Sequence, residues 1–454
     1  MASRVRLRTF AFATAFSLAF AACGGSTSST APSTAPSTAP SAAPSTAASA
    51  APSASPAAIP QLTIKVGALG GLTGDLAQAG GAWCQAAKVG TEDLASRVQA
   101  MGYSDKIKVT FVGCEDSGGA AASGIEAAKK LVDVEGANFV VGDFFSSVTV
   151  AAAQAVFIPK KIIDFTGGTA PSISDLNKTT GATWMWRMAP PDSIQGPVVA
   201  KLMGESLKAG KTGTVNVAAR NDTYGVGLAD AFKKAWEAGG GKIGQSVVYN
   251  PDAPTLDTEA QKIASGTPDG WFLVSFCGDW GKLKGPLQRS GTWDPTRTFG
   301  GDALGGCPKP NATVAGMRNA LGDVTHGPSN GSWQALYTAK ADPKVTFQSF
   351  TSEAFDPPYV AFLAALKAGS SDPDKVRAEM QAVTSAPGTQ CTFETIDVCA
   401  KAILAGQDVD FEGASGPIAF GPLGDPSIVT YNVNQSAGDG AVQDKTIGQV
   451  TLGK

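Results

Sequence analysis

The sequence predicts an α/β protein made of two lobes, each built around a parallel β-sheet, with a ligand cleft between the lobes. Three observations predict this fold. Short apolar runs alternate with longer amphipathic runs from Leu62 onward, which indicates repeated strand–helix units and parallel strands joined by right-handed crossovers. The alternation stops once, at residues 184–193, and then begins again. The 394 residues after Pro60 exceed the usual size of a domain with a single hydrophobic core and match the size of two domains.

The first series of elements starts with a strand at 62–68, LTIKVGA, in which apolar and polar side chains alternate. A helical stretch follows at about 75–101. The series continues with strands at 107–113, 138–142 and 161–165 and with helices at 122–134 and 149–157.

The stretch WMWRMAPPDS at 184–193 separates the two series. Two sheets that face each other place the carboxyl ends of their strands, and the helix N-termini after them, across a common cleft that suits a small ligand. The second series contains helices at 194–210, 224–240, 256–265 and 280–291 and strands at 214–219, 242–249, 270–276 and 297–303.

The first 60 residues predict export and a lipid anchor. Residues 1–22 carry three arginines and then a mostly apolar run that ends in small residues, as in a secretory signal peptide. Cys23 follows Ala-Ala, which resembles the bacterial lipobox, although Phe20 stands where that motif usually has leucine. Residues 23–60 are uncharged and rich in Ser, Ala and Pro, so they predict a lipid-anchored, disordered linker. The alternative is secretion without a lipid on Cys23.

The charge pattern argues against a nucleic-acid partner. The chain has a formal net charge of −3 and no basic cluster, whereas nucleic-acid-binding proteins carry a basic patch. No second apolar segment approaches 18 residues, so we expect the body of the protein to meet the membrane only through Cys23.

Six further cysteines predict disulfide bonds. An even number in an exported chain favours disulfides over metal, and the chain has no CxxC pair and no Cys/His cluster. Six cysteines allow 15 pairings. The order of the elements favours neighbouring pairs, namely Cys84 with Cys114, Cys277 with Cys307 and Cys391 with Cys399.

Three stretches resemble enzyme motifs, but none of them fits. CEDSGG at 114–119 is similar to the nucleophile loop of trypsin-like proteases, but the chain has one histidine, His326, and an α/β order. GESLKAGKT at 204–212 has five residues between its glycines where a phosphate-binding loop has four, and it ends a helix. GALGGLTG at 67–74 does not match the dinucleotide pattern GxGxxG. We therefore expect a binding protein and no enzyme, with no catalytic residue, cofactor or metal site.

The order and spacing of five motifs resemble the branched-chain amino-acid (Leu/Ile/Val)-binding branch of the type I periplasmic binding proteins, which are the substrate-binding components of ABC importers. The motifs are IKVGALGGLTGDLAQAG (64–80), VVGDFFSSVTVAAAQAVFIPKKIIDFTGGTAP (140–171), WRMAPPDSIQGPVVA (186–200), NDTYGVGLADAFKKAWEAGGGKI (221–243) and TFGGDAL (298–304). The resemblance implies two Rossmann-like lobes joined by three hinge crossovers, within MAPPDS and near 316–324 and 412–417. It assigns 61–188 and 325–415 to lobe 1 and 189–324 and 416–454 to lobe 2.

The resemblance also implies ligand-binding residues in lobe 1. Ser146 stands where a serine binds the ligand carboxylate, at the start of a helix whose N-terminus adds a partial positive charge. Thr169 matches a threonine that offers its hydroxyl and backbone N–H to the ligand. Gly167 matches a residue whose carbonyl oxygen accepts a hydrogen bond from the ligand ammonium. Ser147 adjoins them. Two of these residues also have a purely structural interpretation. Ser147 would then only cap its helix, and Thr169 would only shape its loop.

In lobe 2 the resemblance implies that Tyr224 covers the ligand and that Asp302 neutralises its ammonium group. The alternative for Tyr224 is simple packing at a helix start. The chain departs from the family pattern at CGDW (277–280), where many relatives have tyrosine, and at Phe144 and Phe145, which add aromatic bulk. These departures leave the ligand open.

The implied function is that of a lipid-anchored, extracytoplasmic solute receptor. It would act as a monomer, close on a small molecule, with an amino acid favoured, and deliver it to an ABC permease in the membrane. Three alternatives remain at this point: a sensor for a signalling partner, a receptor for urea, short amides or aromatic acids, and an exported amide hydrolase.

Overall fold

The computed structural model describes residues 58–74, 76–305, 307–322, 330–438 and 445–452. The signal peptide, Cys23, His326 and most of the linker lie outside the described residues. Among the residues that are described, every helix is too short or too polar to cross a membrane.

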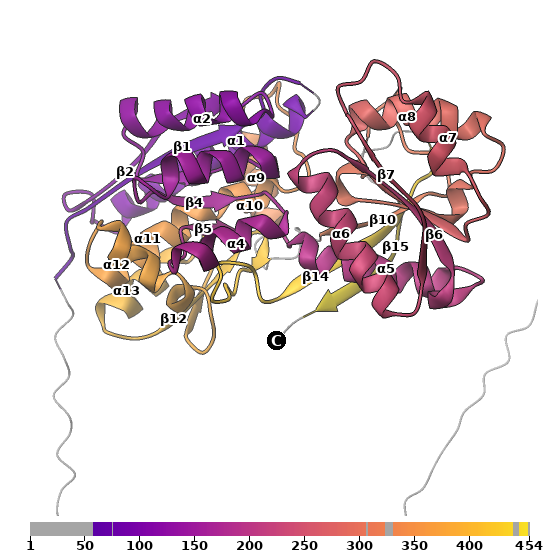
Figure 1. Cartoon of the computed structure of the whole chain (residues 1–454). Coiled ribbons are helices and arrows are strands. Elements are labelled where there is room, and N and C mark those ends of the chain that lie inside the picture. The colour runs from indigo at the N-terminus through magenta and orange to yellow at the C-terminus, as the bar shows by residue number, and fades with distance from the viewer. Residues whose placement is uncertain (1–57, 75, 306, 323–329, 439–444, 453–454) are drawn as a thin grey trace, which may run out of the picture. The chain divides into compact units, whose positions relative to one another are not determined.

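The first sheet has five parallel strands in the order β2-β1-β3-β4-β5 (Figure 1). It confirms the first predicted series and adds a fifth strand, β5, inside the stretch that separates the two series. Its strands are β1 (Leu62–Gly70), β2 (Ile107–Asp116), β3 (Phe139–Val141), β4 (Ile163–Thr166) and β5 (Met185–Arg187), and the helices between them are α1 (Ala77–Ala100), α2 (Ala121–Lys129), α3 (Ser146–Ala152) and α4 (Pro171–Thr180).

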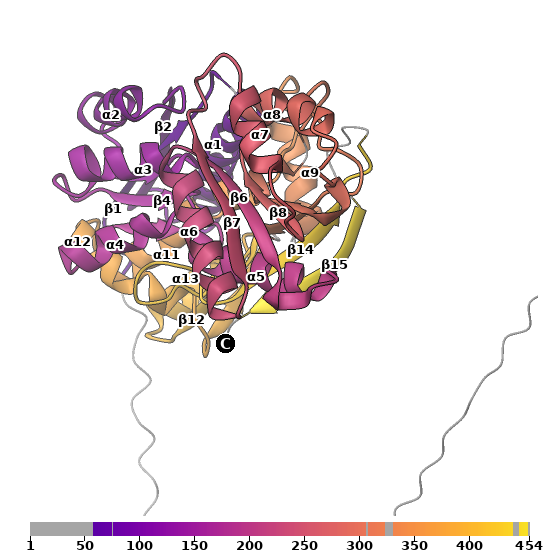
Figure 2. The same cartoon turned by 45° about the vertical axis from the view of Figure 1, so that its right-hand side comes forward.

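The second sheet has seven strands in the order β15-β14-β10-β9-β8-β6-β7. The five strands from β7 to β10 are parallel. Four of them correspond to the predicted second series, whereas β10 forms where the resemblance places the second crossover. β14 pairs antiparallel with both β10 and β15, and Figure 2 shows β14 beside β15. Its strands are β6 (Thr214–Arg220), β7 (Lys242–Tyr249), β8 (Gly270–Val274), β9 (Thr298–Gly300), β10 (Arg318–Gly322), β14 (Val429–Gln435) and β15 (Lys445–Leu452), with helices α5 (Asp192–Ser206), α6 (Thr223–Ala238), α7 (Asp257–Ala264) and α8 (Cys277–Arg289).

Side-chain alternation along β8 separates the two faces of the second sheet. Phe272 and Val274 pack in the core that contains residues of α5 and α6. Trp271 and Leu273 pack in a separate core with residues of α7 and α8. Because successive strand residues point to opposite faces, a fully apolar strand such as β8 requires helices on both sides.

The C-terminal third of the chain adds helices beside the first sheet. Helix α11 is buried on nearly all sides and contacts both α1 and β1. Helix α1 approaches α10 so closely that a Cβ at Gly90 would lie 2.4 Å from the Phe355 carbonyl oxygen. The added elements are α9 (Asn330–Lys340), α10 (Thr351–Phe355), α11 (Pro357–Ala368), α12 (Pro373–Glu379), α13 (Ile396–Leu404) and the small sheet β11 (Thr389–Cys391), β12 (Val409–Gly413) and β13 (Gly416–Pro417).

The order of the described elements places three passages between the two large sheets: after β5, after β10 and after β13. The third passage begins later than the sequence suggests. β13 still pairs with β12, Phe420 packs on Trp186, and Asp425 binds Arg187. Residues 416–427 therefore lie with the first sheet, although the sequence assigns 416–454 to lobe 2, and the chain joins the second sheet only from β14 onward.

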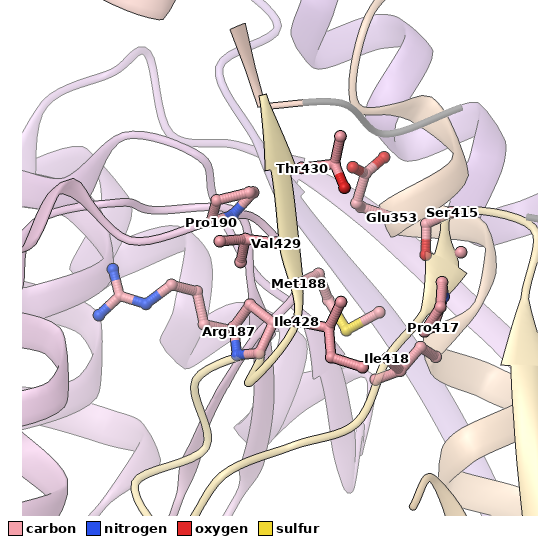
Figure 3. Close-up of a pocket in the computed structure, with 12 residues that line it drawn as sticks. Arg187, Met188, Pro190, Glu353, Ser415, Pro417, Ile418, Ile428, Val429 and Thr430 are labelled. Carbon is pink, nitrogen blue, oxygen red and sulfur yellow. The ribbon is translucent and has the colours of Figure 1, made fainter. Parts of the chain in front are cut away.

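A small cavity of about 70 Å³ lies where the first and third passages meet. Figure 3 shows the apolar side chains of Met188, Ile418 and Ile428 around it, while the Arg187 side chain extends away from them.

Three disulfides join neighbouring cysteines, and these are the pairs that the order of the elements favours. The structure links Cys84 with Cys114, Cys277 with Cys307, and Cys391 with Cys399. Each pair tethers a helix to a strand or loop that is close in sequence.

Candidate ligand-binding cleft

A cavity of about 440 Å³ lies where loops that follow strands of both large sheets meet. Most of these loops follow the carboxyl ends of β1, β3, β4, β6, β8 and β9, which is the edge where open parallel sheets bind ligands. The lining residues are Gly74, Leu76, Ala77, Gln78, Ala79, Trp83, Phe144, Gly167, Thr169, Tyr224, Phe276, Cys277, Asp302, Ala303, Gly305, Pro308, Leu321, Gln348, Ser349, Phe350 and Thr351.

Four of the six ligand residues expected from the sequence line this one cavity: Gly167, Thr169, Tyr224 and Asp302. Gly167 and Asp302, the first and last of these residues, are more than 130 positions apart in the sequence. The packing of the two sheets brings them to one cavity. The two serines of the expected set do not line it.

Ser146 is buried behind the cavity wall. It is only 1% exposed, and its Oγ accepts hydrogen bonds from the N–H groups of Thr169 at 3.2 Å and Ala170 at 3.1 Å. The contact positions the loop that carries Thr169. Ser147 is half-buried and lies inside α3; the cap position before that helix is occupied by Phe145, which makes no side-chain cap.

Tyr224 and Asp302 form a hydrogen-bonded pair at the cavity wall. The Tyr224 hydroxyl donates to Asp302 Oδ1 at 2.7 Å, and the Ala303 N–H donates to the same oxygen at 2.9 Å. Gly301 makes this possible, because a Cβ there would lie 2.6 Å from the tyrosine hydroxyl. Burial raises the pKa of Asp302, and the hydrogen bond from Tyr224 opposes that rise.

Asp192 is a candidate that the sequence analysis missed. It is fully buried at the start of α5, and its N–H donates to the Thr169 carbonyl at 2.8 Å. Within the described residues, neither of its carboxylate oxygens accepts a hydrogen bond of good geometry. Burial raises the pKa of Asp192 well above its ordinary value, and the charge of Asp302 raises it further. In sequence it is an acidic residue in a first helical turn, which usually indicates only a favourable helix-dipole interaction.

Arg187 holds the loop of Thr169 from the other side. Its side chain is 0% exposed. The guanidinium donates to the carbonyl oxygens of Gly168 at 2.9 Å and Ala170 at 3.1 Å, to Ser174 Oγ at 2.9 Å and to Asp425 Oδ1 at 2.8 Å. One side chain therefore ties the proposed ligand loop to the third passage of the chain.

The motif CEDSGG ends strand β2 and begins the turn that follows it, with the buried acid Asp143 beside the turn. Ser117 Oγ donates to Asp143 and accepts from the Gly119 N–H at 3.1 Å, so its contacts are those of a turn residue. Over the described part of the chain, no group of three His, Cys, Asp or Glu side chains is placed to hold a metal ion.

Residues 63–397 match the sequence model of the periplasmic binding protein family. The match spans most of the chain, so the protein belongs to this family. Members of the family bind small-molecule ligands outside the cytoplasm and work with ABC transporters, and both the family and the fold are those of binding proteins rather than enzymes.

Several individual proteins are similar to this chain. A Leu/Ile/Val-binding protein of Rhizobium johnstonii is 26% identical over 68% of this chain and 80% of its own length. A chemotactic signal transduction system substrate-binding protein of Halobacterium salinarum is 24% identical over 65% of this chain and 69% of its own.

Solved structures show the same fold. The branched-chain amino acid transporter substrate-binding protein of Streptococcus pneumoniae, in complex with isoleucine, has 18% identity and a TM-score of 0.64 over 86% of this chain and 99% of its own. A solute-binding protein of R. palustris, in complex with 4-hydroxybenzoate, has 17% identity and a TM-score of 0.66 over 86% of this chain and 98% of its own.

Proposed function

We propose that this protein is the amino-acid receptor of an ABC importer. The observation that carries the proposal is the convergence of Thr169, Gly167, Tyr224 and Asp302 on one cavity. The Asp302 carboxyl is complementary to an ammonium group, and the Thr169 hydroxyl is complementary to a carboxylate.

In the proposed complex the ligand ammonium lies at Asp302 and donates a hydrogen bond to the Gly167 carbonyl oxygen. Its carboxylate lies at Thr169. We propose that Ser146 also contributes to binding of the carboxylate. Its hydroxyl oxygen accepts hydrogen bonds from two N–H groups, and its own proton is not used in any hydrogen bond among the described residues. The two lobes close on the ligand because the ligand binds more tightly to their closed arrangement than to their open arrangement.

Titration calorimetry with amino acids tests the assignment of the ammonium site. A hydrogen bond to a charged group contributes about 1.5–3 kcal/mol, so Asp302→Asn should weaken amino-acid binding by at least about tenfold. Asp257→Asn is the matched control, because Asp257 is an exposed acid paired with Arg289. Equal amino-acid affinity in the two variants would contradict the assignment.

We also propose that Cys23 carries a lipid, that the protein acts as a monomer, and that the linker holds its body near the permease outside the cell membrane. The family's location outside the cytoplasm and the lipobox-like sequence support this. Cys23→Ser should move the protein from the membrane fraction to the soluble fraction, as seen by immunoblot.

A sensor role is the second candidate, and the name of the Halobacterium relative favours it. The two functions separate in a strain that lacks the protein. Loss of amino-acid uptake supports the importer, whereas normal uptake with a lost behavioural or transcriptional response to the ligand supports the sensor.

A further inference from the structure

Aromatic side chains form one continuous wall of the ligand cavity. Trp83 contacts Phe144 edge to face, with ring centroids 6.0 Å apart, and Phe144 stacks on Phe145 at 5.0 Å. Phe145 meets Phe276 edge to face at 5.4 Å, and Phe276 stacks on Tyr224 at 5.4 Å with only 5° between the ring planes. Four of the five, all except Phe145, line the cavity itself.

The backbone around this wall is shaped to hold the rings. A Cβ at Gly71 would lie 2.7 Å from the Phe145 ring, and one at Gly119 would lie 2.9 Å from it. A Cβ at Gly167 would lie 2.7 Å from the ring of Trp83. Three glycines therefore provide the space that the aromatic groups occupy.

Phe276, one ring of this wall, is held by charged and aromatic neighbours. The Arg220 guanidinium carbon lies 3.7 Å from the centroid of Phe276, and Arg220 is itself held by Asp222 and Asp279. Phe276 is thus confined by a cation, by Tyr224 and by Phe145. Because rings fixed in this way cannot collapse around a small side chain, a short aliphatic ligand would leave part of the wall without contact.

The polar groups and the aromatic wall adjoin each other. Gly167, a proposed contact of the ligand ammonium, lies directly against the ring of Trp83 and within contact of Phe144, and Tyr224 belongs to both the Asp302 pair and the aromatic chain. A ligand bound at the polar groups therefore directs its side chain onto the rings.

We infer that the ligand carries an aromatic ring, and that Trp83 and Phe144 select it. This inference rests on the proposed amino-acid receptor function and gives its ligand class as an aromatic amino acid. Edge-to-face contacts with the ring of the ligand add attraction beyond that of buried area, and a cavity of about 440 Å³ accommodates a ligand larger than a branched-chain amino acid.

Calorimetry on the purified protein with phenylalanine, tyrosine, tryptophan, leucine, isoleucine, valine, benzoate, phenylacetate and urea tests the inference. At least one aromatic amino acid should bind about tenfold more tightly than leucine. Phe144→Leu should reduce that ratio to below about threefold while leucine affinity stays within about threefold. Phe111→Leu is the matched control, since Phe111 is also half-buried and lies on β2 outside the cavity lining, and it should leave the ratio unchanged.

Each other outcome overturns a defined part of this reasoning. Leucine, isoleucine or valine binding as tightly as the aromatic amino acids overturns the aromatic inference and leaves the receptor function standing. Binding of benzoate or phenylacetate alone supports the aromatic wall and overturns the amino-acid assignment. Binding of urea alone, or of nothing in the panel, overturns both. An aromatic preference that persists in Phe144→Leu overturns the role of this residue, and the wild-type ratio decides the ligand class even if that variant does not fold.

Discussion

Replacement of Arg187 by methionine tests whether one buried cation holds the proposed ligand loop. The guanidinium is fully buried and makes four hydrogen bonds, one of them to the carboxylate of Asp425, whose side chain is 23% exposed. Methionine fills similar space but removes the positive charge beside the Asp425 carboxylate, which keeps only the Ser174 hydroxyl as a donor among the described residues, and removes one donor from each of two carbonyl oxygens. Breaking a buried ion pair by removal of one partner costs about 3–5 kcal/mol.

We expect the lower end of that range, about 3 kcal/mol, because water can still reach part of Asp425. Urea unfolding of the disulfide-intact protein measures the change, provided that the slope with denaturant is the same in both proteins. Arg289→Met is the matched control. Arg289 and its partner Asp257 are 69% and 54% exposed, so this variant should lose less than about 1 kcal/mol.

Ligand affinity should fall together with stability in Arg187→Met, because the Gly168 and Ala170 carbonyls flank Thr169 and lose their donor. A loss of unfolding free energy no larger than that of Arg289→Met would refute the reasoning. It would mean that the loop and the third passage are held by the surrounding packing instead of by the guanidinium.

Two further predictions concern buried polar groups and covalent links. Burial raises the pKa of Asp143 to about 7, so its contribution to stability is present below about pH 4 and is lost as the pH rises through 7. The unfolding free energy of Asp143→Asn relative to wild type should therefore rise by up to about 4 kcal/mol between pH 4 and pH 7, and a pH-independent difference would contradict this. Opening the Cys277–Cys307 link, of sequence separation 30, by double serine substitution should cost about 3.5 kcal/mol, against about 2.5 kcal/mol for the Cys391–Cys399 link, of separation 8. Only loss of the Cys277–Cys307 link should weaken ligand binding in calorimetry, because Cys277 lines the cavity.

The order of strands and helices was largely predictable from the sequence because it depends on local periodicity. The strand predicted at 270–276 corresponds to β8, and the helix predicted at 224–240 to α6 (Thr223–Ala238). β5 (Met185–Arg187) was missed because it lies inside residues 184–193, which the sequence analysis assigned to the boundary between the two series. The antiparallel pairing of β14 was missed as well, because nothing in a strand's own sequence indicates the direction of its neighbour.

The candidate site was predictable only in part. Thr169, Tyr224 and Asp302 follow strand ends, and the carboxyl ends of parallel strands lie at one edge of a sheet. The position of Ser146 behind that edge was not predictable, because it depends on which side of α3 faces the loop at Thr169. The burial of Asp192 depends on the first passage of the chain, and local sequence does not encode it.

The sequence by itself determined the class of this protein: an α/β chain with two sheets, polar loops after the ends of its strands, and neighbouring cysteines in position to pair. These features follow from spacing within short segments. Only the tertiary structure decided which side chains share the cavity, how Arg187 joins the ligand loop to a segment 238 residues away, and that Trp83, Phe144, Phe276 and Tyr224 form one wall. Those contacts join segments far apart in the chain, so their geometry arises only when the two sheets and the passages between them pack together.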